Sequence, residues 1–167
     1  RWYLLQDKYA LRCHDRALTP EASWQFLAAA PVGRLGLAAT DGSPYIVPLN
    51  HVVCGHEIFF HCAGKGRKLE LLRANPQVCY EVDSQLGTKT GPRACDFGTY
   101  YKSVIAFGQA YEVDDNEKKA EILNRLVQKH APSGHSFEPA TAVDAASVAI
   151  IGIRVETLTG KSRPYIT

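Results

Sequence analysis

Three cations and two glycines stand together near the middle of the chain, in a pattern that could bind an anion. Gly64 and Gly66 free the backbone for a sharp turn, and Lys65, Arg67 and Lys68 are interleaved with them. If this turn leads into a helix, unpaired backbone N–H groups and the helix dipole attract anions to the same place. The pattern therefore predicts a phosphate-binding turn, with a solvated basic turn as the alternative.

The residues on either side of this turn indicate the elements that position it. Residues 57–63 are apolar and rich in aromatics, which favours a strand buried on both faces. After Arg67 the leucines Leu69, Leu71 and Leu72 follow a helical period, and Asn75-Pro76 ends it. The cations are thus expected between a buried strand and the first turn of a helix.

Two histidines lie near this turn and could contact a ligand or take part in proton transfer. His61 is on the apolar strand just before it, and His51 is on the preceding strand. For each, a core histidine satisfied by a hydrogen bond is the competing interpretation. We expect the remaining histidines at the surface: His14, His56, His130 and His135.

Composition limits the class of protein. A chain of 167 residues with 46% hydrophobic and 22% charged residues is typical of one soluble globular domain. A net charge of +2 gives no indication of nucleic acid or membrane as the main partner. No apolar run approaches the length of a membrane span, and the first residues lack a signal-peptide pattern. We therefore expect a cytoplasmic protein.

The cysteines favour a reducing compartment and no metal site. There are five of them, widely spaced and without a CxxC pair, which argues against a disulfide framework or structural zinc. Cys95 could be a redox thiol, but this would require a lowered pKa.

The periodicity predicts a mainly β domain over residues 19–167, preceded by an arm over residues 1–18. Thr19-Pro20-Glu21 is a helix start, and Asp114 with Glu117 predicts a capping box for a helix to about residue 130. A polar loop is expected over 83–99 and a helical turn near Val143. Strands are expected over 32–40, 43–53, 57–63, 77–82, 100–113 and 147–157. Because the early links are too short for crossovers, the six strands should form a closed antiparallel sheet.

Several segments, in this order and spacing, resemble a known family. They are VGRLG at 32–36, DGSPYIVPLN at 41–50, IFFHCA at 58–63, GRK at 66–68, NPQVC at 75–79 and YKSVI at 101–105 followed by Gly108. Together they resemble the pyridoxamine 5′-phosphate oxidase-like flavin-binding split barrels, and within these the nitroimidazole-resistance (Nim-type) branch. The resemblance extends from about residue 16 to 113.

The resemblance implies a six-stranded Greek-key split β-barrel with two to three peripheral helices, which forms a homodimer and holds FMN, or sometimes FAD, between subunits. Arg67 and Lys68, with Lys65 nearby, would bind the phosphate, and Ser103 would come from the partner subunit. The other positions that would contact the flavin are Pro48, Leu49, Asn50, His51, Val52, Phe60 and His61.

Three functions remain open on the sequence. The first is a flavin-dependent oxidoreductase acting on nitro-aromatics or other small electrophiles, with His61 as a catalytic candidate. The second is a haem-binding protein with His61 or His51 as axial ligand. The third is a non-catalytic flavin or small-ligand sensor. Vitamin B6 oxidation is not expected, because the chain ends GKSRPYIT where the B6 oxidases carry an Arg/His substrate signature.

Overall fold

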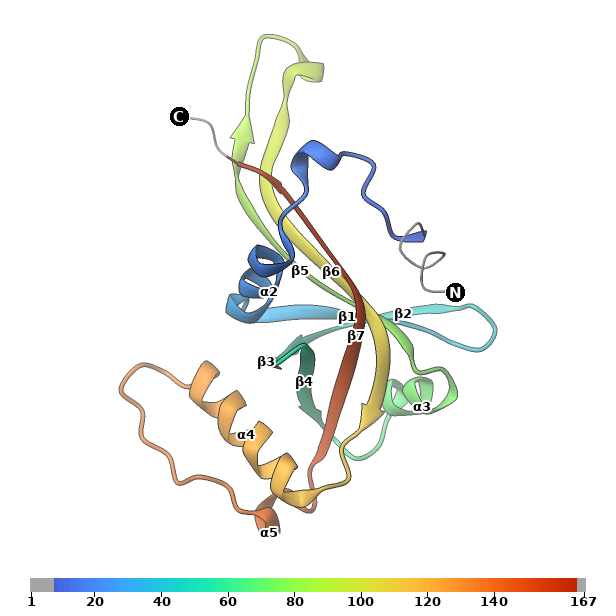
Figure 1. Cartoon of the computed structure of the whole chain (residues 1–167), viewed down its shortest axis with the longest axis vertical. Coiled ribbons are helices and arrows are strands. Elements are labelled where there is room, and N and C mark those ends of the chain that lie inside the picture. The colour runs from blue at the N-terminus through green and yellow to red at the C-terminus, as the bar shows by residue number, and fades with distance from the viewer. Residues whose placement is uncertain (1–7, 165–167) are drawn as a thin grey trace.

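The computed structural model describes residues 8–164, which form a mainly β fold with helices at its periphery (Figure 1). The strands are β1 Val32–Ala38, β2 Pro44–Asn50, β3 Val52–Cys54, β4 Glu57–Cys62, β5 Gln77–Lys89, β6 Gly98–Glu112 and β7 Ala149–Arg163. The helices are α2 Pro20–Ala29, α3 Arg67–Ala74, α4 Asn116–His130 and the single turn α5 Ala142–Ala145, with 3₁₀ turns at His14–Arg16 and Ala94–Asp96.

The strands form one antiparallel sheet in the order β2-β1-β5-β6-β7-β4-β3. Only His51 separates β2 from β3 in the chain, yet these strands lie at opposite edges of that order. The chain passes from one edge to the other at this residue, and the sheet curls into a split barrel. The predicted antiparallel split barrel is confirmed, but the sheet is curled and not closed, because β2 and β3 form its two edges and do not pair with each other. The strand predicted over 43–53 is divided at His51, so the described residues contain seven strands instead of six.

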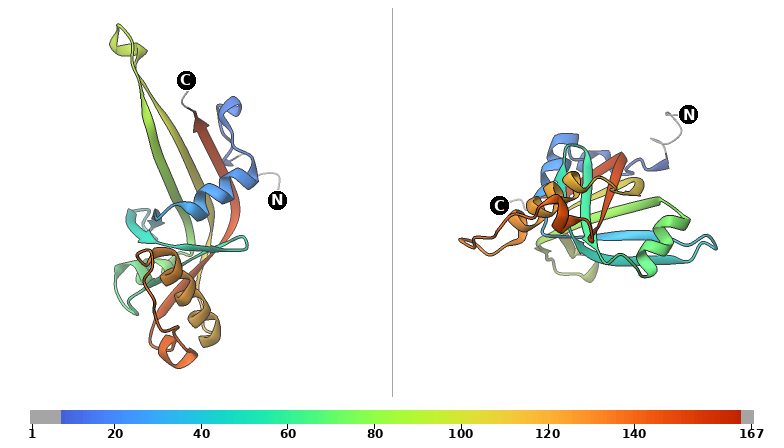
Figure 2. Two further views of the ribbon diagram at one scale, coloured as in Figure 1. Left: turned by 90° about the vertical axis from the view of Figure 1, so that its left-hand side faces the viewer. Right: turned by 90° about the horizontal axis from the view of Figure 1, so that it is seen from below.

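A long β-hairpin replaces most of the polar loop that was predicted over 83–99. The β5–β6 pairing continues out to the pair Lys89 and Gly98, with a bulge between Gln85 and Gly87. The hairpin projects well beyond the barrel, at the end opposite to α4 and α5 (Figures 1 and 2). Strand β7 also extends to Arg163, six residues past its predicted end at 157, and pairs with β6 along this length.

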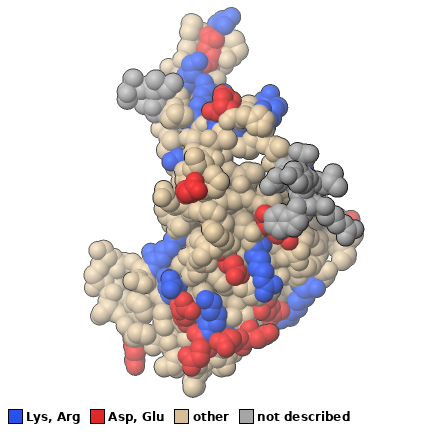
Figure 3. Space-filling model, viewed as in Figure 1, with Lys and Arg blue, Asp and Glu red and all other residues tan. Residues whose placement is uncertain are grey.

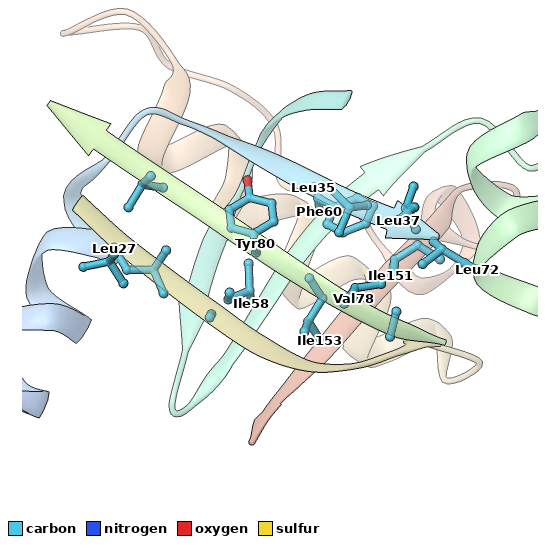
Figure 4. Close-up of a cluster of buried hydrophobic side chains, with 14 of the residues drawn as sticks. Leu27, Leu35, Leu37, Ile58, Phe60, Leu72, Val78, Tyr80, Ile151 and Ile153 are labelled. Carbon is cyan, nitrogen blue, oxygen red and sulfur yellow. The ribbon is translucent and has the colours of Figure 1, made fainter. Parts of the chain in front are cut away.

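The main core fills the inside of the curled sheet. Leu35, Ile58, Phe60, Tyr80 and Ile153 have no exposed surface and pack there with other apolar side chains (Figure 4). The Tyr80 hydroxyl donates to the carbonyl of a β2 residue at 3.0 Å, so this buried polar group has a partner. Burial of each such large side chain contributes roughly 1.5–3 kcal/mol.

A second, smaller apolar cluster attaches α4 to the barrel. Ile122 and Leu126 of the helix pack against Phe59 of β4, Ile150 of β7 and Val113. Asp115 is the N-cap of this helix, and its side chain accepts the Lys118 backbone N–H at 2.6 Å. The predicted cap at Asp114 was therefore one residue early. Because the apolar cluster joins the two elements, one face of α4 is held against β4.

The start of α2 is as predicted. Thr19 is the N-cap and its hydroxyl accepts the Ala22 N–H at 3.2 Å, with Pro20 in the first turn. Before it, the described part of the predicted arm packs on its own chain. The Tyr9 ring stacks on Phe107 of β6, with 3.7 Å between ring centroids.

Acidic and basic side chains are mixed over the face of the molecule shown in Figure 3. No helix within residues 8–164 is long and apolar enough to cross a membrane. The same residues contain no cluster of three or more His, Cys, Asp or Glu side chains that could hold a metal ion.

Candidate ligand-binding site

The basic turn lies between β4 and α3, as the sequence predicts. Gly66 is the N-cap of α3 and has φ of 121°, a left-handed conformation that favours glycine. No described side chain caps this helix, and its first internal backbone bond runs from the Glu70 N–H to the Gly66 carbonyl at 3.2 Å. The N–H groups of the first turn therefore have no helical acceptor and are available to an anion.

Two of the three cations of the turn lie over aromatic rings. The Arg67 guanidinium lies 4.9 Å from the ring centroid of Tyr45, and the Lys68 ammonium lies 5.4 Å from that of Phe60. Lys65 is exposed. Among residues 8–164, none of these three cations forms an ion pair. None of the three is therefore fixed by an ion pair, although the charge of Arg67 reaches Asp41, and each remains able to bind a phosphate.

A pocket of about 350 Å³ opens between β4 and α4 and begins on the same strand that leads to the basic turn. We call it the α4 pocket. Asn50 and His61 line it from the barrel side, and the helix side contributes Leu123, Leu126, Val127, His130 and Ala131. Mostly apolar walls with a few polar groups are typical of small-molecule sites. Two imidazoles and one amide are the polar groups here.

Hydrogen bonds attach the C-terminal end of α4 to His51, the residue between β2 and β3. We call this set of hydrogen bonds the clamp. The His51 carbonyl accepts from Lys129 Nζ at 2.9 Å and from His130 Nε2 at 3.0 Å. Lys129 Nζ also donates to the Ala30 carbonyl at 2.8 Å. Burial lowers the pKa of Lys129 to about 8. The clamp joins α4, the end of α2 and the β2–β3 break, which fixes one wall of the α4 pocket.

The His51 side chain itself belongs to the core. Its ring has no exposed surface, and Nε2 lies 2.8 Å from the Leu27 carbonyl. Because a carbonyl only accepts, Nε2 carries the proton and Nδ1 keeps its lone pair. Nδ1 is buried and has no hydrogen-bond partner among the described residues. Burial lowers the pKa of His51 to about 4, so the ring is neutral near pH 7.

The predicted site residues therefore occupy different environments. Asn50 and His61 meet in the α4 pocket, and exposed Pro48 alternates with Asn50 on the same face of β2. Leu49 is half-buried against the main core, and Val52 is half-buried against the smaller cluster. The buried side chains of His51 and Phe60 are not part of the pocket lining.

Ser103 lies elsewhere in the single chain. It is on β6, where it pairs with Asp83 of β5 and Lys161 of β7, and it does not line the α4 pocket. The resemblance placed it in the site of a second subunit, and that expectation stays a prediction.

His130 is the residue that sequence reasoning missed, because a surface position was predicted for it. The structure places it in the pocket with His61. Its spacing carried the signal: Leu123, Leu126, Val127 and His130 stand at i, i+3, i+4 and i+7, which is one face of a helix. A polar residue that continues an apolar stripe at a helix end is a candidate pocket residue.

These features define a class of protein: an antiparallel split barrel with a cationic helix start and a small, histidine-containing pocket on one strand. The sequence model of the family described as pyridoxamine 5′-phosphate oxidase matches residues 19–162. The chain belongs to this family, and the resemblance seen in the sequence is confirmed.

Solved structures share the fold. A putative 5-nitroimidazole antibiotic resistance protein from Bacteroides thetaiotaomicron is 23% identical, with 87% of this chain and 85% of that chain covered and a TM-score of 0.71. The flavocytochrome Anf3 from Azotobacter vinelandii is 23% identical, with 96% and 76% covered and a TM-score of 0.81. A FAD-binding protein from Mesorhizobium loti is 26% identical, with 89% and 97% covered and a TM-score of 0.65. A comparison with curated proteins found no match.

Proposed function

We propose that this protein is an FMN-binding flavoprotein that reduces small electrophiles such as nitro-aromatics, at a site completed by a second copy of the chain. The observation that carries the proposal is the basic turn. It combines an uncapped helix start after a positive-φ glycine with three cations that form no ion pair among residues 8–164.

The turn fits the phosphate end of FMN. A dianionic phosphate needs several hydrogen-bond donors, and an arginine offers two in a planar arrangement. Arg67 with Lys65, Lys68 and the free N–H groups of α3 supplies them. The aromatic rings under Arg67 and Lys68 orient both side chains without neutralising their charge.

The α4 pocket is where we propose that the substrate binds. It begins at His61 on β4, four residues before Lys65, and its apolar wall on α4 would exclude water from a small planar substrate. FMN, when bound, would supply the two-electron chemistry. The chain would orient the substrate through Asn50 and exchange protons through the imidazole of His61.

The outer face of β6 supports the second copy. Side chains on β6 alternate, with Val104 and Ala106 fully buried towards the core and Tyr101, Ile105 and Phe107 half-buried on the other face. Tyr9 of the same chain covers Phe107, and the rest of this row on the outside of the sheet is the surface that we propose for a homodimer interface. Ser103 stands in the same row, so the proposed partner would bring it to the site.

A haem-binding function is the second candidate, and one observation favours it. His61 and His130 both line the α4 pocket, so an imidazole is available as an axial ligand. His51 is a poor ligand because its ring is buried and its Nε2 is engaged by Leu27. A pocket of about 350 Å³ in one chain is small for the macrocycle, and we therefore rank haem second. A flavin sensor without turnover is the third.

The absorption spectrum of the purified protein after incubation with FMN and removal of free cofactor separates these functions. We expect the bands of oxidised flavin, which bleach when a nicotinamide donor is added and return when a nitro-aromatic follows. A Soret band would favour haem, and bands that never bleach would favour the sensor. We place the protein in the cytoplasm, since its odd number of cysteines without CxxC spacing suits a reducing compartment.

A further inference from the structure

We infer that His130 is a second proton-exchanging residue of the α4 pocket and that it presents its Nδ1 atom to the substrate. This inference rests on the proposed function, because it names the group that supplies a proton to the substrate of that same site. His130 is the last residue of α4 and lies across the pocket from His61 of β4.

The hydrogen bond to His51 fixes the tautomer of the His130 ring. His130 Nε2 lies 3.0 Å from the His51 carbonyl oxygen, which can only accept. The proton of the neutral ring is therefore on Nε2, and Nδ1 carries the lone pair. Among residues 8–164, Nδ1 of His130 has no hydrogen-bond partner. The nitrogen that can gain or lose a proton is thus the one that no described residue occupies.

The surroundings of His130 hold the ring in place, and the acids that line the pocket are imidazoles. Lys129 binds the same His51 carbonyl at 2.9 Å and reaches the Ala30 carbonyl at 2.8 Å, which fixes the backbone on both sides of the clamp. The titratable groups that face His130 are His61 from β4, His51 from the β2–β3 break and Lys129 from its own helix. Within the described chain, the pocket lining contains no carboxylate. A substrate in the pocket therefore takes protons from an imidazole.

The chemistry of nitro reduction needs such a group. A bound reduced flavin would supply two electrons and one proton as a hydride, and the nitro-aromatic would then need one further proton to release water and leave the nitroso compound. His130 in its protonated form donates that proton from Nδ1 and regains one from solvent afterwards. The balance is one nitro group, two electrons and two protons in, with one nitroso group and one water out.

The first test compares turnover and its pH profile in His130→Gln and in the control His135→Gln. The glutamine amide can still donate to the His51 carbonyl but cannot titrate, whereas His135 is an exposed loop residue outside the pocket. With 2-nitroimidazole as substrate we expect His130→Gln to lose about 100-fold in kcat, within the range for a general acid, and to lose the alkaline fall of the profile. Both variants should keep the wild-type melting temperature. Wild-type kcat and profile in His130→Gln would overturn the inference.

The second test needs no flavin, so it separates this inference from the proposed function. Nitrogen-15 NMR of the histidine rings in the flavin-free protein should show His130 protonated at Nε2, with the Nδ1 resonance shifting when 2-nitroimidazole is added. A proton on Nδ1 at neutral pH, or a resonance that 2-nitroimidazole does not move, would refute it. If the wild-type protein binds no flavin but the Nδ1 resonance responds, the proposed function fails and the inference about the pocket stands.

Discussion

Replacement of Arg67 by alanine should weaken FMN binding by about 10- to 100-fold and leave riboflavin binding almost unchanged. A charge-assisted hydrogen bond is worth roughly 1.5–3 kcal/mol, and about 1.4 kcal/mol corresponds to a tenfold change in Kd. We expect the lower half of this range, since Arg67 is exposed and solvent screens its charge. Arg67→Lys should fall between the wild type and Arg67→Ala, because lysine lacks the planar pair of donors.

The fold should tolerate this change. Arg67 has no ion-pair partner among residues 8–164 and contacts the face of Tyr45, so its loss should lower the melting temperature by no more than about 2 °C. Arg93→Ala is the control: this side chain, in the turn that connects β5 to β6, is 75% exposed and, unlike that of Arg67, forms an ion pair, with Asp96 at 3.0 Å. The assay is a flavin-fluorescence titration of FMN and riboflavin against each variant. Equal weakening of riboflavin and FMN by Arg67→Ala, or equal effects of Arg67→Ala and Arg93→Ala, would refute the phosphate-binding role.

Three further changes test other parts of the account. His61→Ala should reduce turnover at least tenfold with a melting temperature within about 2 °C of wild type, since the side chain is exposed; a large stability loss with normal turnover would make it a structural residue. The pKa of His51 is about 4 in the folded protein and 6.5 for an unperturbed histidine. As the pH falls, the unfolded chain therefore binds the proton before the folded protein does. Stability by urea unfolding should fall by up to about 3 kcal/mol between pH 6.5 and 4, and His51→Gln should flatten this slope. An equal slope in both proteins would exclude His51 as its cause. Lys129→Met removes the donor to two carbonyls and should cost about 2 kcal/mol, or roughly 4–8 °C in melting temperature, and an unchanged melting temperature would show that the clamp contributes little.

The elements that sequence predicted well are those with a strong local signal. Thr19-Pro20 marks the start of α2, and the glycines before Arg67 mark the change from strand to helix. The basic turn can therefore be located from the amino-acid sequence alone. In each case neighbouring residues in the sequence determine the conformation, and tertiary contacts only reinforce it.

The elements that sequence missed depend on contacts between distant segments. Strand β5 beyond Val82 has few buried side chains and no apolar alternation, so residues 83–89 look like a polar loop, and only pairing with β6 makes them a strand. The break at His51 lies where the chain passes from one edge of the curled sheet to the other, because β2 pairs with β1 and β3 pairs with β4. His130 enters the site only because α4 packs on β4 through Leu126 and Phe59.

Native mass spectrometry of the protein incubated with FMN tests the central claim most directly, because cofactor and assembly are read in one spectrum. We expect a species of two chains of 18.4 kDa each with two FMN molecules bound. Arg67→Ala should give the same dimer with less FMN retained. A monomer that retains FMN as tightly as is expected of the dimer would contradict a flavin site completed by a second copy. A dimer that retains no FMN would contradict a flavin site built on the basic turn.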